Sequence, residues 1–322
     1  MKKILVLLLI ICLFGCKSNK TYEKYYYSYF DTVSLVKSYS DDDEKTFNQK
    51  ADKIEAILNK YHNLLDTFED HDVNGLYKIN QLAGKESVIV DNELFDLLKF
   101  GKEIYSITNG KTNIMMGSIT KIWKSAISDE KLPDDDSLLE ASKHISIDSL
   151  VLNEDDLSVY ISDEYSLIDV GSIAKGYVCD VIKEELGDKL DGYSISLGGN
   201  ILLIGNKYDG TDFKIGIKDP FKENSLAKTL TVSDTSLVTS GNYERYFDLD
   251  GVRYHHIIDP DTLYPSMYYA SVTVVYEESK ICDALSTALF SMSIEDGKKI
   301  LENYPGISVT WIDLDNNIID YW

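Results

Sequence analysis

The sequence predicts an α+β fold with mixed and largely antiparallel sheets and helices packed against them. Two observations favour this class: predicted strands outnumber predicted helices, and several strands follow one another directly along the chain. A third is that neither a GxxxxGKS/T phosphate-binding loop nor a GxGxxG dinucleotide-binding loop occurs. A doubly wound parallel sheet therefore fits less well.

Residues 1–15 predict a lipoprotein signal peptide. A positive start, Met1-Lys2-Lys3, precedes an apolar stretch at 4–14, which is shorter than the roughly 20 residues that a spanning helix needs. The order Leu13-Phe14-Gly15-Cys16 resembles a bacterial lipobox, so we expect Cys16 to carry a diacylglyceryl anchor. A plain secretory signal and a buried N-terminal strand are the alternatives.

Residues 16–24 then form the lipidated cysteine and a polar tether, and residues 25–322 form one continuous folded unit. We expect the protein to lie at the cell membrane, lipid-anchored on the extracytoplasmic face.

The composition restricts the classes of partner that the protein can bind. The hydrophobic fraction of 44% and the charged fraction of 27% are those of a folded protein. A formal charge of −22 argues against nucleic acid and gives no attraction to an anionic bilayer, so membrane attachment depends on the lipid.

Cys179 and Cys282 lie in apolar helical patterns without a CxxC, which favours buried free thiols over a disulfide.

The first half of the folded unit begins with a predicted strand at 25–39. The acidic run at 41–44 suits a helix N-terminus, where negative charge is favoured. Apolar residues then recur at helical spacing: Ile54, Ile57, Leu58, Tyr61 and Leu65. A second helix covers 92–108 and ends at Gly110, and residues 129–156 are acidic and loop-like with a short helix and short strands.

The second half has clearer patterns. Residues 172–186 form an amphipathic helix that Gly187 ends, and residues 193–205 form two strand segments that meet at Gly198-Gly199. A helix at 283–292 lies between the last two of the remaining strands, which we place at 213–217, 226–232, 254–258, 272–276 and 307–312.

Three segments could carry chemistry. In ICDALSTAL (281–289), Asp283 and Thr287 stand four apart and share a helix face, a hard-oxygen pair that suits Mg²⁺. The alternative is that Asp283 caps the helix. In DVGSIAKGY (169–177), Gly171 leads into a helix N-terminus that can face an anion, with Lys175 adding a charge and Asp169 an acceptor. A turn with a solvated lysine explains this segment equally well.

The third segment holds adjacent histidines, His255 and His256, which point to opposite sides of a regular strand and cannot share one ion. Either one of them faces a cleft as a base, or both are structural. Gly198-Gly199 would let backbone approach a flat or phosphorylated ligand, although an ordinary turn also explains it. We find no His, Cys and Asp in zinc-ligand spacing.

Six segments taken in order are far more specific than any one of them. They resemble the ApbE family of FAD:protein FMN transferases, a T-fold-related group, over nearly the whole chain after the signal peptide. The matching stretches are TNGKTNIMMGSITKIW (108–123), DVGSIAKGYVCD (169–180), SLGGNILLIG (196–205), TSGNYERYF (239–247), HHIIDPDTLYP (255–265) and SVTVVYEESKICDALSTALF (271–290).

The resemblance implies a catalytic unit at 25–322 and a set of site residues. It places Mg²⁺ on the side chains of Asp283 and Thr287 and on the carbonyl of Ser172. The implied contacts with the substrate FAD are Phe30, Phe68, Lys111, Thr112, Asn113, Asp169, Lys175 and Ile257. Two departures stand out: Asn113 replaces a common Asp, and Leu263 replaces a glycine of the DP-x-T-G-x-P turn.

The implied reaction is Mg²⁺-dependent transfer of the FMN half of FAD to a Thr or Ser hydroxyl, with release of AMP. The acceptor would be a protein of a membrane or extracellular redox system with a Ser/Thr-Gly-Ala-Thr-like motif. His256 is our hypothesis for the general base, because it lies one residue from Ile257. Alternatives are an Mg²⁺-dependent FAD pyrophosphatase, a non-catalytic flavin-binding lipoprotein, and a surface adhesion or scaffold lipoprotein.

Overall fold

The computed structural model describes residues 21–322. The predicted signal peptide, the predicted lipidation at Cys16 and most of the tether lie outside the described residues. Among helices within 21–322, none combines the length and the apolar character needed to cross a membrane.

The chain enters the fold through a hairpin. Strand β1 (Tyr22–Tyr29) pairs antiparallel with β2 (Thr32–Ser38), so the prediction of one strand at 25–39 is wrong. The turn consists of Phe30 and Asp31, which both adopt left-handed backbone, with φ of 55° and 50°. Such turns usually contain Gly or Asn, and neither residue is present to signal the reversal.

An eight-stranded antiparallel sheet forms the centre of the molecule, in the order β1-β2-β6-β7-β10-β13-β14-β15. The strands after the hairpin are β6 (Tyr193–Leu197), β7 (Asn200–Ile204), β10 (Ser236–Gly241), β13 (Tyr269–Tyr276), β14 (Ser308–Asp313) and β15 (Ile318–Tyr321). The predicted turn at Gly198-Gly199 joins β6 to β7, and both glycines have positive φ, 56° and 102°. The predicted α+β class with antiparallel sheets is confirmed.

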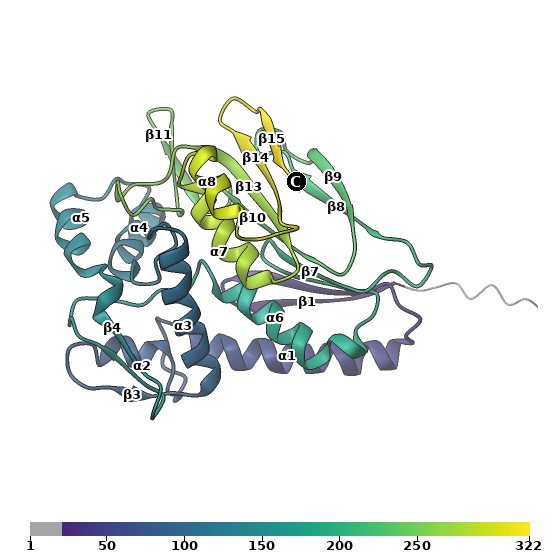
Figure 1. Cartoon of the computed structure of the whole chain (residues 1–322), viewed down its shortest axis with the longest axis horizontal. Helices are drawn as coiled ribbons and strands as arrows, with labels where there is room; N and C mark the ends of the chain where they lie inside the picture. The colour runs from purple at the N-terminus through teal and green to yellow at the C-terminus, as the bar shows by residue number, and fades with distance from the viewer. Residues whose placement is uncertain (1–20) are drawn as a thin grey trace, which may run out of the picture.

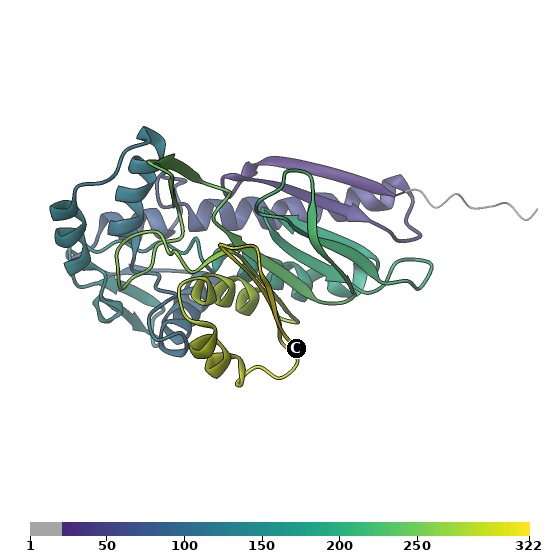
Figure 2. The same cartoon turned by 90° about the horizontal axis from the view of Figure 1, so that it is seen from above.

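Four helices gather against this sheet: α1 (Glu44–Leu65), α6 (Ala174–Leu186), α7 (Ser279–Phe290) and α8 (Ile294–Leu301) (Figures 1 and 2). Helix α7 packs on β10 and β13, and α6 packs between α7 and α1. Asp43 caps α1 by accepting a hydrogen bond from Thr46 N at 2.8 Å, as the acidic run predicts. Cys179 and Cys282 are fully buried free thiols in α6 and α7, which confirms their prediction.

The remaining helices group at one end of the molecule (Figures 1 and 2). They are α2 (Leu76–Gln81), α3 (Asn92–Ile107), α4 (Gly117–Asp129) and α5 (Asp135–Ala141). A small antiparallel sheet accompanies them, in the order β3 (Val88–Ile89), β5 (Ser158–Ile161), β4 (Leu150–Asn153). The helix predicted at 92–108 is α3, whose C-cap is Thr108.

Two hairpins complete the fold: β8 (Phe213–Lys218) with β9 (Leu226–Val232), and β11 (Tyr246–Leu249) with β12 (Val252–His255). The strand predicted at 254–258 is wrong at its end, because β12 stops at His255. There Ile257 N donates to His255 Nδ1 at 3.2 Å instead of continuing a ladder.

Candidate active site

The junction between α6 and α7 brings two of the sequence motifs together. Gly176 N on α6 donates to the Asp283 carboxylate on α7 at 2.8 Å. A Cβ on Gly176 would stand 2.4 Å from the Ser279 carbonyl oxygen, so only glycine permits this approach. Asp180 completes the junction by accepting hydrogen bonds from Ser279 N (2.7 Å) and Lys280 N (2.9 Å), which caps α7.

Asp283 does not cap its own helix. Helix α7 begins at Ser279, so the predicted start at 283 is four residues late and Asp283 lies one turn inside. The alternative in which this carboxylate is an N-cap is therefore excluded. Burial raises the pKa of Asp283, and the nearby charge of Lys175 and the Gly176 N–H oppose that rise. A buried carboxylate of this kind is most stable beside a cation.

Two further oxygens at the junction are uncommitted. Thr287 lies on the same face as Asp283, is partly exposed, and its hydroxyl makes no hydrogen bond to any described residue. The Ser172 carbonyl likewise accepts no bond within 21–322, because Gly176 N, its expected helical donor, is given to Asp283. A carboxylate, a hydroxyl and a carbonyl form a donor set that fits Mg²⁺.

Asn200 adds a polar group to the same place. Its amide faces the Asp283 carboxylate and lowers the pKa of that group. The Nδ2 atom is buried, however, and makes no hydrogen bond of normal geometry within the described chain. An unsatisfied buried donor of this kind calls for a bound water, anion or ligand in a native site.

The 108–123 segment lies against α7 through Thr112, whose hydroxyl donates to the Ala284 carbonyl at 2.8 Å. Lys111 is held by two carboxylates, Asp259 at 2.7 Å and Asp261 at 2.8 Å. The structure therefore brings Lys111 to the HHIIDPD loop. It brings Thr112 to helix α7 at the α6–α7 junction.

The Asn113 side chain holds the 108–123 segment in place through two hydrogen bonds. Its amide donates to the Ile145 carbonyl at 2.9 Å and accepts from Met115 N at 2.9 Å. An aspartate could not donate to Ile145, which explains the departure from the common Asp at this position. The other departure, Leu263, adopts the left-handed conformation that suits glycine, with φ of 62°.

Asp169 and Lys175 organise the turn that precedes α6. Asp169 accepts hydrogen bonds from Gly171 N (2.9 Å) and the Thr120 hydroxyl (2.7 Å), and Lys175 Nζ donates to the Gly171 carbonyl at 3.2 Å. This arrangement places a positive charge and a helix N-terminus next to Asp283, a combination that favours anions.

The two histidines have separate roles. His255 is buried, accepts Ile257 N on Nδ1 and contacts the Ser266 carbonyl through Nε2 at 2.9 Å, so it is structural. The His256 side chain is exposed to water. Burial, followed by the charges of His255, Arg245 and Lys175, lowers the pKa of His256 to about 3.

Phe30 and Phe68 lie on another part of the site. Lys124 Nζ stands 3.7 Å above the Phe68 ring and 3.9 Å from Asp31, which places both aromatic residues in one region. Arg245 connects this region to the histidines, because it donates to the Asp31 carbonyl at 3.1 Å and its own carbonyl accepts His256 N. Ile257, the last predicted contact, is buried.

Sequence reasoning assigned no role to Asp180, Asn200 or Arg245. Each lies inside or next to a motif quoted above, but their partners are distant in sequence. Only the scarcity of arginine in this lysine-rich chain could have drawn attention to Arg245.

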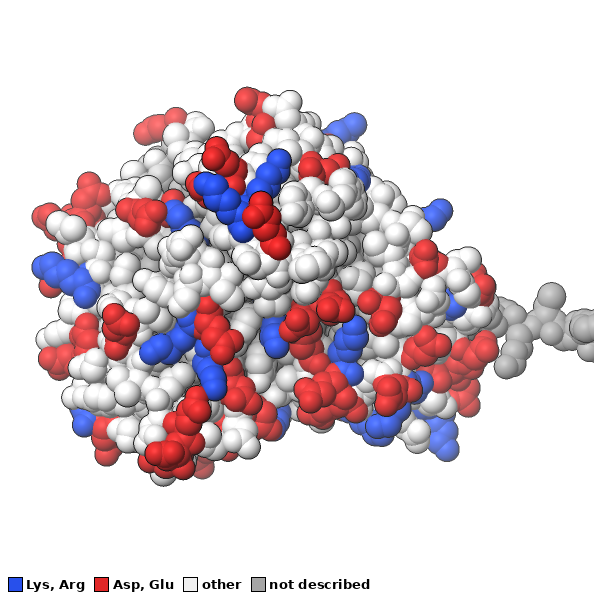
Figure 3. Space-filling view, in the orientation of Figure 1, with Lys and Arg blue, Asp and Glu red and all other residues white. Residues whose placement is uncertain are grey.

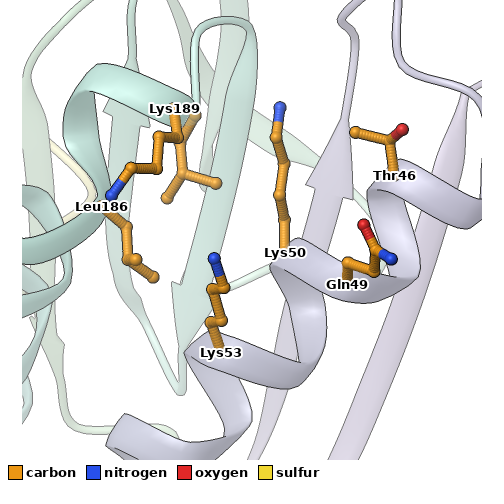
Figure 4. A pocket seen from close by; sticks show the side chains of 7 residues that line it. Thr46, Gln49, Lys50, Lys53, Leu186 and Lys189 are labelled. Carbon is orange, nitrogen blue, oxygen red and sulfur yellow. The ribbon is translucent and has the colours of Figure 1, made fainter.

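The surface charge differs from the charge at the site, and one cavity lies apart from the site. Acidic side chains are spread over the face shown in Figure 3, whereas Lys175 and Arg245 bring positive charge to the site from two segments. A separate cavity of about 180 Å³ lies between α1 and the end of α6, beside Lys50, Lys53 and Lys189 (Figure 4). Because it contains none of the motif residues, we do not assign it to this site.

Comparison with known proteins gives a consistent result. The model of the ApbE family matches residues 30–311. An FAD:protein FMN transferase of Klebsiella pneumoniae (strain 342) is 30% identical over 288 residues, covering 88% of this chain and 87% of the relative. One from Treponema pallidum (strain Nichols) is 32% identical over 308 residues, covering 89% and 83%.

Solved structures share the fold. The ApbE protein of Thermotoga maritima superposes with a TM-score of 0.82 at 28% identity, covering 93% of this chain and 96% of its own. The flavin transferase ApbE of Vibrio cholerae gives a TM-score of 0.78 at 24% identity, covering 94% and 97%.

Proposed function

The chain belongs to the ApbE family and is an FAD:protein FMN transferase, and on that premise we propose how its own residues carry out the transfer. The reaction we propose moves the FMN half of FAD to a Thr or Ser hydroxyl of an acceptor protein, requires Mg²⁺ and releases AMP. The observation that carries this proposal is the α6–α7 junction, where the buried Asp283 carboxylate and two uncommitted oxygens, the Thr287 hydroxyl and the Ser172 carbonyl, lie beside a lysine.

Asp283, Thr287 and the Ser172 carbonyl would hold the metal. When bound, Mg²⁺ would neutralise charge on the pyrophosphate of FAD as its P–O bond breaks. Lys175 and the N-terminus of α6 add positive potential at the same place, and the unsatisfied Asn200 Nδ2 offers a hydrogen bond to the substrate.

His256 supports the chemistry of the acceptor. Its imidazole makes no hydrogen bond to any described side chain, faces solvent and is neutral at pH 7, since its pKa lies below the ordinary value. In the proposed step the acceptor oxygen bonds to the phosphorus that carries riboflavin, its proton passes to His256, and the bond from that phosphorus to AMP breaks.

The flavin would lie on the remaining predicted contacts. Phe30 and Phe68 provide aromatic surface, and Thr112 and Asp169 provide polar atoms. Lys111, Asn113 and Ile257 shape the walls through the contacts described above.

The acceptor and the location are also proposals. We propose an acceptor of a membrane or extracellular redox system with a Ser/Thr-Gly-Ala-Thr-like motif. A lipid on Cys16 would hold the enzyme at the extracytoplasmic face of the cell membrane, within reach of such an acceptor. The acidic chain makes a nucleic-acid partner unsuitable.

The test uses the form that begins at Lys17, mixed with FAD, Mg²⁺ and an acceptor domain that carries the motif. We expect the intact mass of the acceptor to rise by one FMN, one AMP to appear for each FMN attached, and EDTA to abolish both. Release of AMP and free FMN without any acceptor adduct would instead identify an FAD pyrophosphatase. Tight FAD binding with no product would identify a flavin carrier.

A further inference from the structure

A cluster of metal-ligand side chains lies outside the site described above. His62 is in the last turn of α1, Asp66 is the C-cap of that helix, and His71 is in the loop that follows. Their ligand atoms all lie within 4.8 Å of one another, and each side chain is partly buried. We call His62, Asp66 and His71 the His–Asp–His cluster.

The sequence shows no zinc-ligand spacing, and this cluster is assembled by the fold. His62 and Asp66 are four apart, so the helix brings them to one face. His71 joins them only because the loop folds back, with Nε2 at 2.9 Å from Asp66 Oδ2. That return is a tertiary feature that spacing does not reveal.

The donor types select a class of metal. Two imidazoles and one carboxylate suit Zn²⁺ and neighbouring transition metals, whereas Mg²⁺ prefers oxygen ligands and retained water. Metal–ligand bonds of about 2.0–2.1 Å in a tetrahedron place ligand atoms roughly 3.3 Å apart. The observed contacts therefore need only small side-chain movements to enclose an ion, with a fourth position left for water.

The surroundings orient the ligands. The second oxygen of Asp66 accepts Phe68 N at 2.7 Å and Glu69 N at 3.1 Å, which fixes the carboxylate as supporting hydrogen bonds do in metal sites. His62 Nδ1 has only a long contact from Phe30 N, at 3.4 Å, so little is lost if this nitrogen turns to a metal.

We propose that the His–Asp–His cluster binds one divalent transition-metal ion of the zinc class, and that this ion fixes the loop 66–71. The loop carries Phe68, whose side chain is 57% exposed and is otherwise contacted by Lys124. Tying both ends of the loop to one ion removes much of its freedom before any ligand arrives.

The effect of the metal on FAD binding rests on the proposed function. If Phe68 contacts the flavin, a loop ordered in advance should bind FAD more tightly, so FAD affinity should rise with metal occupancy. Metal binding itself does not depend on that function and can be measured without FAD.

The experiment is calorimetric titration of Zn²⁺ into the full chain, prepared without a polyhistidine tag and with Mg²⁺ in excess. Its variants are His71→Ala and Asp66→Asn. The matched control is His144→Ala, because His144 forms the same kind of pair with Asp163 (2.7 Å) but has no third ligand among the described residues. Hydrogen exchange of the amides at 66–71 is followed in parallel.

We expect one Zn²⁺ site in the wild type and in His144→Ala, weakened by at least roughly tenfold in His71→Ala and Asp66→Asn. Zn²⁺ should slow amide exchange at 66–71 in the wild type and not in His71→Ala. Equal Zn²⁺ affinity in the wild type and His71→Ala, or no Zn²⁺ site at all, would overturn the proposal. An unchanged exchange rate at 66–71 would overturn the part that concerns the loop.

Discussion

Asp283 shows how one side chain can both hold the fold and prepare a site. One of its oxygens accepts Gly176 N and joins α7 to α6, while its burial raises its pKa and makes a nearby cation favourable. Because Gly176 N is given to Asp283, the Ser172 carbonyl is left free. The structural contact thus creates one of the proposed metal ligands.

Replacement of His256 tests the proposed base at the residue scale. We expect His256→Ala to lower kcat by roughly 10²- to 10⁴-fold with little change in FAD affinity, because the imidazole acts on the acceptor hydroxyl. The rate of flavin attachment under saturating FAD measures this. His255→Ala is an unsuitable control because His255 is buried in the core.

The pH profile gives a second readout for the same residue. A pKa lowered to about 3 keeps His256 neutral throughout the range near neutrality, so its protonation should cause no loss of rate around pH 6.5. Full turnover of His256→Ala at pH 7 would remove it from the mechanism. An acid limb near pH 6.5 that disappears in the variant would show that the site lowers this pKa far less.

At this scale the sequence could identify the candidate residues but not their partners. The four-residue spacing of Asp283 and Thr287 predicts a shared helix face, and the structure places them so. Nothing local shows that Asn113 donates to Ile145 or that Arg245 reaches Asp31, because both contacts join distant segments.

The α6–α7 junction is the element on which the site depends. Asp180 caps α7 from the neighbouring helix, and Gly176 lets the two backbones come close enough for Asp283 to be reached. Patterns of apolar spacing predicted both helices, yet the start of α7 was placed late. The polar cap that starts it belongs to another helix, so no N-cap signal stands next to it in the sequence.

Substitution of Gly176 by alanine tests this junction. The added Cβ would meet the Ser279 carbonyl oxygen at 2.4 Å, so the helices must separate. We expect the free energy of unfolding, measured in urea, to fall by about 1–3 kcal/mol. The Mg²⁺ concentration that gives half of the maximal transfer rate should rise.

The control is Gly187→Ala at the end of α6. Gly187 has right-handed helical backbone and its Cβ would meet only Lys183 Cγ at an ordinary 3.7 Å, so stability should be unchanged or slightly raised. Equal behaviour of the two variants would show that the close approach of α6 and α7 is not needed.

Over the whole molecule, the excess of strands over helices and the strands that follow one another directly were sufficient to predict an α+β fold with antiparallel sheets. The strand order was not predictable, because β10 lies between β7 and β13 although two hairpins separate these strands in the chain. The first hairpin was missed for a local reason: its turn uses Phe30 and Asp31 with positive φ instead of glycine or asparagine.

Stability of the whole fold should depend on pH through His255. Burial lowers its pKa from 6.5 to about 4, so below pH 6.5 the unfolded chain takes up a proton that the folded chain refuses. Stability is therefore complete above pH 6.5 and declines as pH falls toward 4. We expect His255 alone to cost about 2 kcal/mol between pH 7.5 and pH 5.

Urea unfolding of the wild type and of His255→Gln at both pH values measures this difference. The variant should show a smaller decline than the wild type, since glutamine does not titrate. Parallel declines in the two proteins would assign the pH dependence to other groups.

The most direct test of the central claim compares flavin transfer by the wild type and Asp283→Asn. The asparagine oxygen can still accept Gly176 N, so the fold should be kept while the charge that would hold Mg²⁺ is lost. We predict that the folded variant attaches FMN to the acceptor at least roughly 100-fold more slowly at saturating Mg²⁺, a loss typical of removing one electrostatic catalytic contact. Transfer at the wild-type rate by Asp283→Asn, with the same dependence on Mg²⁺, would contradict the assignment of the metal to the α6–α7 junction.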